Sequence, residues 1–168
     1  MANEQNDTQE TPAAENVAPK TFNLQDFLMS EKEVEELSVW VEFKHGISFH
    51  LRYIPRSELQ RITRDSTEMK WSDEAKGRVA QISSDKLVPA FCRRAVKDWK
   101  GVTPTSLANL VPIKLDKVPE QAREMSIPFT QKQLHEVVKT AFELDVFLQQ
   151  SASDLSLFNP DQEPEAKN

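Results

Sequence analysis

The sequence predicts an α+β fold, mainly α, in which an antiparallel β-hairpin near the amino terminus is followed by a packed helical region. Apolar and polar residues alternate over 39–43 and again over 47–53, on both sides of a glycine-containing turn, as in the two strands of a hairpin. Further along, apolar residues recur every three or four positions over 87–99 and 134–148, the spacing of one helix face. We therefore expect one hairpin and two main helices around a single core.

The domain is expected to span residues 21–158, between two polar and acidic ends. Residues 1–20 and 159–168 contain almost no side chains to bury, so we expect both ends to be disordered. The formal net charge of the chain is −6, of which −3 belongs to residues 1–20 and −2 to residues 159–168. The remaining −1 makes the domain nearly neutral, which argues against a strongly basic nucleic-acid platform.

Three segments flank the hairpin. Residues 22–29 form an apolar patch that we interpret as an arm docked on the domain, and Ser30 is expected to cap a first helical turn rich in glutamate. After the hairpin, Ser57 and Gln60 have the spacing of a capping box, which predicts a short helix. The polar stretch 65–77 is then expected to be a helix end followed by a loop.

The central helical pattern begins at Arg78 and reaches its widest apolar face over 87–99. Because a proline inside a helix removes a hydrogen bond, we expect a break or a new first turn just before Pro89. Gly101 is expected to end this helix in the left-handed conformation. Residues 102–126 contain several prolines and are expected to be extended or irregular over the core.

The last helix is predicted to start after Thr130, which with Gln133 repeats the capping-box spacing. At helical spacing Asp145 falls inside the apolar stripe, whereas Val146 and Phe147 fall outside it. Either the helix bends or shifts there, or it has a second apolar surface. That second surface is either buried within the monomer or exposed as a partner site.

The sequence indicates neither catalysis nor a cofactor. With 3 glycines in the chain, no phosphate-binding loop can be assembled, and the histidines lack a second ligand at zinc-like spacing. The single cysteine, Cys92, excludes an internal disulfide and lies on an apolar helix face, where we expect it to be buried and unreactive. No apolar run suits a signal peptide or a membrane span, so we expect a protein of a reducing cytoplasm.

A second interpretation concerns the hairpin, which mixes aromatic and basic side chains. Aromatic stacking combined with phosphate contacts is how proteins hold single-stranded nucleic acid. Most of these aromatic residues nevertheless fall on the positions that the alternation assigns to the core. We keep a small nucleic-acid-binding or regulatory module as the alternative function, together with a minor structural subunit of a virion.

The order of elements resembles that of the tail assembly chaperones of long-tailed bacteriophages. The likeness extends over residues 39–158: a hairpin, an apolar helix ending in Trp-Lys-Gly-Val, a variable loop, Pro-Phe-Thr opening a helix, and a closing Ser-Ala-Ser-Asp-Leu-Ser-Leu-Phe. The matching residues are Trp99, Gly101, Val102, Pro128, Phe129, Thr130, Ser151, Asp154 and Phe158.

The resemblance implies a non-enzymatic protein that is made in the bacterial host cytoplasm and is absent from the finished virion. Such a protein coats the phage tape-measure protein, keeps it soluble and helps recruit the tail-tube protein, and homo-oligomers are implied as well. Membrane and nucleic acid are not expected as partners. The candidate partner-binding residues are Trp99, Phe129, Val146, Phe147 and Phe158.

Overall fold

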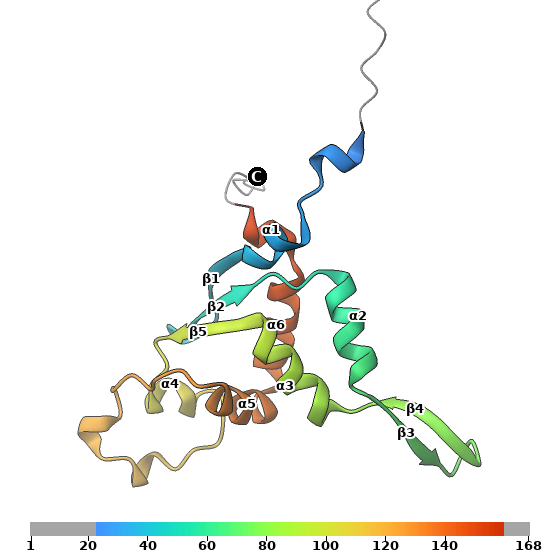
Figure 1. Ribbon diagram of the computed structural model, residues 1–168. Coiled ribbons are helices and arrows are strands. Elements are labelled where there is room, and N and C mark those ends of the chain that lie inside the picture. Colours follow the sequence, from blue (N-terminus) through green and yellow to red (C-terminus); the bar gives the residue numbers. More distant parts are fainter. Residues whose placement is uncertain (1–22, 160–168) are drawn as a thin grey trace, which may run out of the picture.

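A computed structural model describes residues 23–159 of the chain, which adopt the predicted α+β, mainly α, architecture (Figure 1). The ends that we expected to be disordered, 1–20 and 159–168, lie outside the described residues apart from Asn159. The helices are α1 (Glu31–Glu36), α2 (Arg56–Asp65), α3 (Ser84–Ala95), α4 (Pro104–Ala108), α5 (Gln131–Thr140) and α6 (Phe142–Ser153). Short 3-10 helices are η1 (Leu24–Phe27), η2 (Leu115–Lys117), η3 (Glu120–Ala122) and η4 (Leu155–Phe158).

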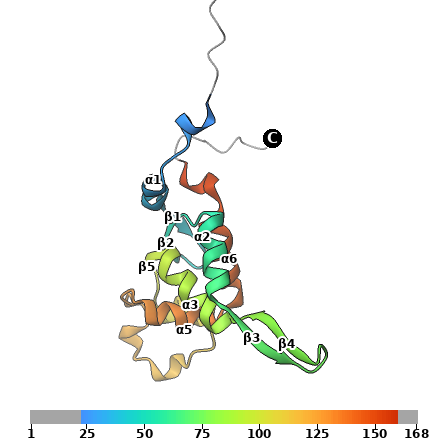
Figure 2. The same ribbon diagram turned by 45° about the vertical axis from the view of Figure 1, so that its right-hand side comes forward.

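Two antiparallel sheets accompany these helices in residues 23–159. The first has the strand order β1-β2-β5 and the second is the hairpin β3-β4. Their strands are β1 (Ser38–Glu42), β2 (Ser48–Arg52), β3 (Thr67–Ser72), β4 (Gly77–Ile82) and β5 (Val96–Lys100). In both views the helices α3, α5 and α6 gather with the first sheet, whereas β3-β4 projects away from them (Figures 1 and 2).

The predicted hairpin at residues 39–53 is confirmed as β1 and β2. Val41 pairs with Phe49 and Val39 with Leu51, so alternate side chains lie on one face of the sheet. That face meets α3, α5 and α6 in a single core. Its fully buried side chains include Ile47, Phe49, Leu51, Cys92, Val96, Leu134, Leu144 and Leu148.

The prediction that the central helix continues to Trp99 is wrong. Helix α3 ends at Ala95, and the next five residues form strand β5. Val96 and Trp99 are both buried, a spacing of three that is typical of a helix. A register shift between His50 and Leu51 of the pairing strand β2 lets both residues face the core from a strand. The register shift therefore produces, in a strand, the three-residue spacing of buried side chains that is typical of a helix.

Two expectations around α3 also need correction. The helix runs through Pro89 without the predicted break, and the buried residues Phe91, Cys92 and Ala95 that follow the proline offset the lost backbone hydrogen bond. Gly101 does have the left-handed φ of +70°, but it ends a strand and not a helix.

Asp65 ends α2, as the expected helix end in the stretch 65–77 implies, but the expected loop is wrong because residues 67–72 form strand β3. Residues 78–82, expected to begin the central helix, belong to strand β4, so the two segments pair as the hairpin β3-β4. Its strands are exposed along nearly their whole length, so burial imposes no strict alternation on their sequence. The two ends of the hairpin meet at the body, where the Ser83 amide donates to the Ser66 carbonyl at 2.9 Å. Both serines are buried.

The helix starts were predicted with mixed success. Ser30 forms a complete capping box with Glu33, and Thr130 caps α5 by accepting from the Gln133 amide. The capping box expected at Ser57 is wrong, since α2 begins at Arg56 after Pro55, without a side-chain cap. The expected docking of 22–29 is wrong for its described part, because every residue from 23 to 29 is exposed.

The last predicted helix is divided at Ala141, whose φ of −100° and ψ of 89° leave the helical region. This is the shift that the position of Asp145 in the apolar stripe indicated. Beyond α6, η4 returns Phe158 to the core, whereas Leu155 and Leu157 are exposed. The predicted irregular segment 102–126 contains only the short elements α4, η2 and η3.

We expect Gly101→Ala to lower the free energy of unfolding by at least about 2 kcal/mol. A Cβ at this position would lie 2.1 Å from the Gly46 carbonyl oxygen, and the φ of +70° is unfavourable for alanine. Chemical denaturation measures the loss. The matched control is Gly77→Ala, whose Cβ finds its nearest atom at 3.7 Å and should change stability by less than about 1 kcal/mol. Equal losses in the two variants would contradict this account of Gly101.

Candidate partner-binding surface

Three of the five predicted partner-binding residues serve the packing of the carboxy-terminal half. Trp99 is 6% exposed, and its Nε1 donates to the Ile127 carbonyl at 2.8 Å. The Phe129 ring meets the indole edge-on with a centroid distance of 5.4 Å. Phe158 is 5% exposed and lies 5.5 Å from the Tyr53 ring. The proposal that Trp99 and Phe158 face a partner is therefore wrong, because both are enclosed within the chain.

Phe147 and Val146 are both half-buried in α6. The Phe147 ring lies 4.7 Å from that of Phe43 and 6.4 Å from that of Phe49, so it packs on the first sheet. For Phe147, these contacts favour burial within the chain over exposure as a partner site.

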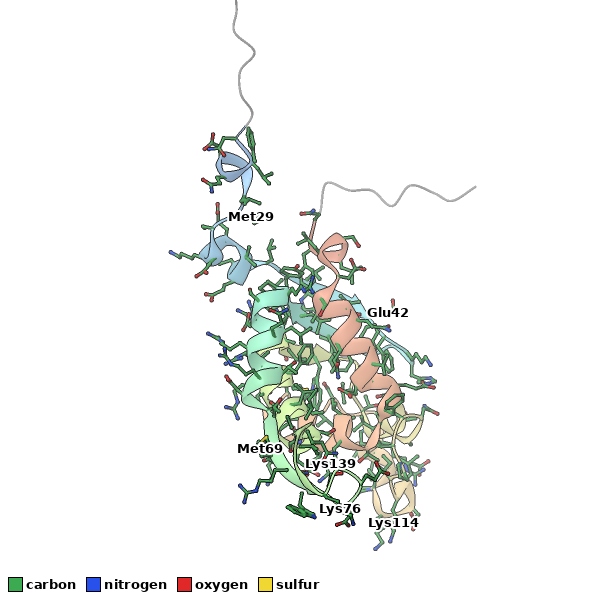
Figure 3. The ribbon with its side chains drawn as sticks, turned by 90° about the vertical axis from the view of Figure 1, so that its right-hand side faces the viewer. Met29, Glu42, Met69, Lys76, Lys114 and Lys139 are labelled. Atoms are coloured by element: carbon green, nitrogen blue, oxygen red, sulfur yellow. The ribbon has the colours of Figure 1, made fainter. Side chains whose placement is uncertain are left out.

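The hairpin β3-β4 instead exposes several large apolar side chains. Paired residues of an antiparallel ladder share one face, so the pairs Met69–Ala80 and Thr67–Ile82 lie together with Trp71. Exposed fractions are 59% for Met69, 67% for Trp71 and 48% for Ile82. Figure 3 labels Met69 on this hairpin, at the end of the molecule where Lys76 marks the turn.

This apolar face continues onto helix α2. An open groove of about 430 Å³ is lined by Leu59 and Thr63 of α2 and by Thr67 and Ile82 of the hairpin. We call the continuous surface formed by Leu59, Thr63, Thr67, Met69, Trp71, Ala80 and Ile82 the apolar strip. Its hairpin part alone, six residues per strand, is about 20 Å long.

Arginines border the apolar strip. Arg56 and Arg64 line the groove beside α2, and Arg78 is the cross-strand partner of Trp71. Arg64 lies 3.6 Å from Asp65, but both side chains are more than half exposed, so this pair is weak. The Trp71 indole is polar at one end, where its Nε1 donates to Asp73 at 3.1 Å. The strip therefore suits an apolar ligand that carries acidic groups.

Sequence reasoning missed this surface although a signal is present. Met69 and Trp71 alternate with lysine and glutamate, and Ala80 and Ile82 alternate across a turn that includes Gly77. Period two on both sides of a turn is the same pattern that identified the first hairpin. The pattern was obscured by Val79, which falls on the opposite face.

The first hairpin offers little for nucleic-acid stacking. Phe43 and Tyr53 pack against the core, and Phe49 is buried within it. On the outer face the Trp40 ring stacks on His50 at 5.0 Å, and the Lys100 Nζ lies 3.9 Å from its centroid. Partial burial, reinforced by nearby Lys97, lowers the pKa of His50, so the imidazole itself adds no positive charge to the stack near neutral pH.

The groups that sequence reasoning considered for chemistry are placed unfavourably for it. Cys92 is 1% exposed, and burial, with a smaller contribution from Asp145, raises the pKa of its thiol to about 12. Within residues 23–159, no three His, Cys, Asp or Glu side chains gather as metal ligands. None of the helices in that range is long and apolar enough for a membrane crossing.

No protein-family model, curated protein or solved structure matches the chain. The functional proposal therefore rests on the surface of this molecule and on the resemblance described above.

We expect Cys92 to react with a thiol reagent at least about a hundredfold more slowly in the folded protein than in denaturant, because only the accessible thiolate is nucleophilic. The rate of modification by an aromatic disulfide at pH 8 measures this. Rapid reaction under native conditions would contradict the burial of the thiol and reopen the question of covalent chemistry.

Trp71→Ser is expected to change the free energy of unfolding by less than about 0.5 kcal/mol, because the exposed ring contributes little to the core. In contrast, Trp99→Ser should cost about 3 kcal/mol or more, since it removes a buried ring. Urea unfolding followed by circular dichroism distinguishes them. A large loss in the Trp71 variant would mean that the strip serves folding and not recognition.

Proposed function

We propose that this protein is a non-enzymatic tail assembly chaperone of a long-tailed bacteriophage, which binds the tape-measure protein and helps recruit tail-tube subunits. The observation that carries the proposal is the apolar strip. Met69, Trp71 and Ile82 expose large apolar side chains on the hairpin β3-β4, which projects from the rest of the molecule (Figure 1). Contiguous exposed apolar surface with a polar border is typical of protein-interaction sites.

The shape of the strip suits a helical client. An amphipathic helix binds through residues at positions i, i+3, i+4 and i+7, which form a narrow apolar stripe. The hairpin face is similarly narrow, with one side chain from each strand at each level. Its length of about 20 Å corresponds to about 13 residues of helix at 1.5 Å per residue. Several copies along one long client would then cover successive segments of it.

The side chains of the strip are also chemically suited to a variable client. Methionine adapts its shape to different apolar partners, and tryptophan provides a large contact area with few rotatable bonds. The bordering residues Arg56, Arg64 and Arg78 favour helices with acidic residues beside their apolar stripe. Such a surface binds a class of helices and not a single sequence.

The test is co-expression with the tape-measure protein encoded by the same phage. The wild-type chain is expected to raise the soluble fraction of the tape-measure protein severalfold, and the double variant Met69→Ser/Trp71→Ser should lose most of that gain because it removes the two most exposed large apolar side chains of the strip. Quantitative gel analysis of the soluble and pelleted fractions provides the measurement.

Phe142→Ser is the matched control, since Phe142 is 77% exposed at the start of α6 and lies outside the strip. It should retain the gain in solubility. No gain with the wild type would contradict the proposed function, and an equal gain with the double variant would exclude the strip as the client site. Purified particles should lack the protein, which distinguishes a chaperone from a virion subunit.

A further inference from the structure

We infer that the apolar strip is also the docking site for the amino-terminal segment of a second copy of this chain. This inference goes beyond the proposed function and does not depend on the identity of the client. It starts from a second exposed apolar surface, at the other end of the molecule. Leu24, Leu28 and Met29 are exposed by 66%, 64% and 48%.

The amino-terminal segment and the strip are complementary in charge. Residues 23–36 have a formal net charge of −4, because five acidic residues accompany only Lys32. The strip, by contrast, is bordered by the three arginines Arg56, Arg64 and Arg78. An acidic segment with large apolar side chains has the composition that the strip favours. Both surfaces therefore find a suitable partner within the same sequence.

The two surfaces are separated within one molecule. Figure 3 labels Met29 toward one end of the described residues and Met69 toward the opposite end, and Figures 1 and 2 likewise show α1 well separated from the hairpin β3-β4. Between them lies α2, ten residues and about 15 Å long, with its amino end beside Met29. A segment anchored by α1 at that end would have to reverse its direction to reach Trp71. A neighbouring molecule can present the segment to the strip directly.

Docking of this kind is head-to-tail, because it joins two different surfaces. Each copy that uses its segment still has a vacant strip, so further copies can add to either end. The few apolar side chains involved make each contact small, and small interfaces are weak and reversible. A client helix that binds the same strip would displace the segment. Self-association would therefore cover the apolar surface until a client arrives.

The test uses two full-length variants that each lack one of the surfaces. The segment variant is Leu24→Ser/Leu28→Ser, and the strip variant is Trp71→Ser/Ile82→Ser. Sedimentation velocity over a roughly hundredfold range of concentration should show that the wild type associates increasingly and that each variant alone stays monomeric. An equal mixture should form a dimer of one copy of each, because one contributes an intact strip and the other an intact segment.

Salt should weaken the wild-type association severalfold, since the contact is partly electrostatic. Phe142→Ser should associate like the wild type, and unchanged circular dichroism spectra should show that both variants fold. A monomeric wild type at every concentration would overturn the inference. So would association of the segment variant by itself, which would indicate strip-to-strip contact, or a mixture that stays monomeric. Because the sedimentation experiment contains no client, a negative result would overturn this inference without contradicting the proposed chaperone function, which co-expression tests separately.

Discussion

The backbone contact between Gly46 and Gly101 is the constraint on which the first sheet depends. Gly46 lies in the turn between β1 and β2, where Ile47 donates to Lys44 at 3.1 Å, and Gly101 ends β5 directly beside it. Because Gly101 has no side chain, the end of β5 can approach the Gly46 carbonyl closely enough to complete its pairing with β2. That pairing buries Val96 and Trp99, and Trp99 in turn holds the long irregular segment through its bond to Ile127.

A cluster of charges connects this sheet to the helix that leads to the apolar strip. Glu58 of α2 forms an ion pair with Arg52 of β2, and both side chains are only 13% exposed. The other carboxylate oxygen of Glu58 lies 3.7 Å from Nε of Arg94 in α3. Two arginines thus share one carboxylate between a strand and two helices. Since α2 continues through Ser66 into β3, this cluster also fixes the direction in which the second hairpin leaves the body.

The comparison of sequence and structure shows where periodicity is informative. It identified the first hairpin and the apolar faces of α3 and α5, because each of these elements has one side in the core. It failed at β5, where a shifted register puts Val96 and Trp99 on the same side of a strand. It failed again at the second hairpin, where solvent on both sides permits an apolar residue on either face, so Val79 obscures the alternation formed by Met69, Trp71, Ala80 and Ile82. The strip was missed for that reason. Trp99 and Phe158 were chosen as partner-binding candidates because they are large and apolar, but both are buried in the core.

The hydrogen bond between Ser66 and Ser83 makes the second hairpin an excursion that leaves the body and returns to the same point. Because this bond brings the two ends of the hairpin together, the chain before residue 67 and after residue 82 can pack the core without residues 67–82. The hairpin itself therefore contributes little to the global fold. Insertions, deletions or exchanges within the excursion are compatible with an unchanged body. Recognition and foldability can consequently evolve as separate traits on this scaffold.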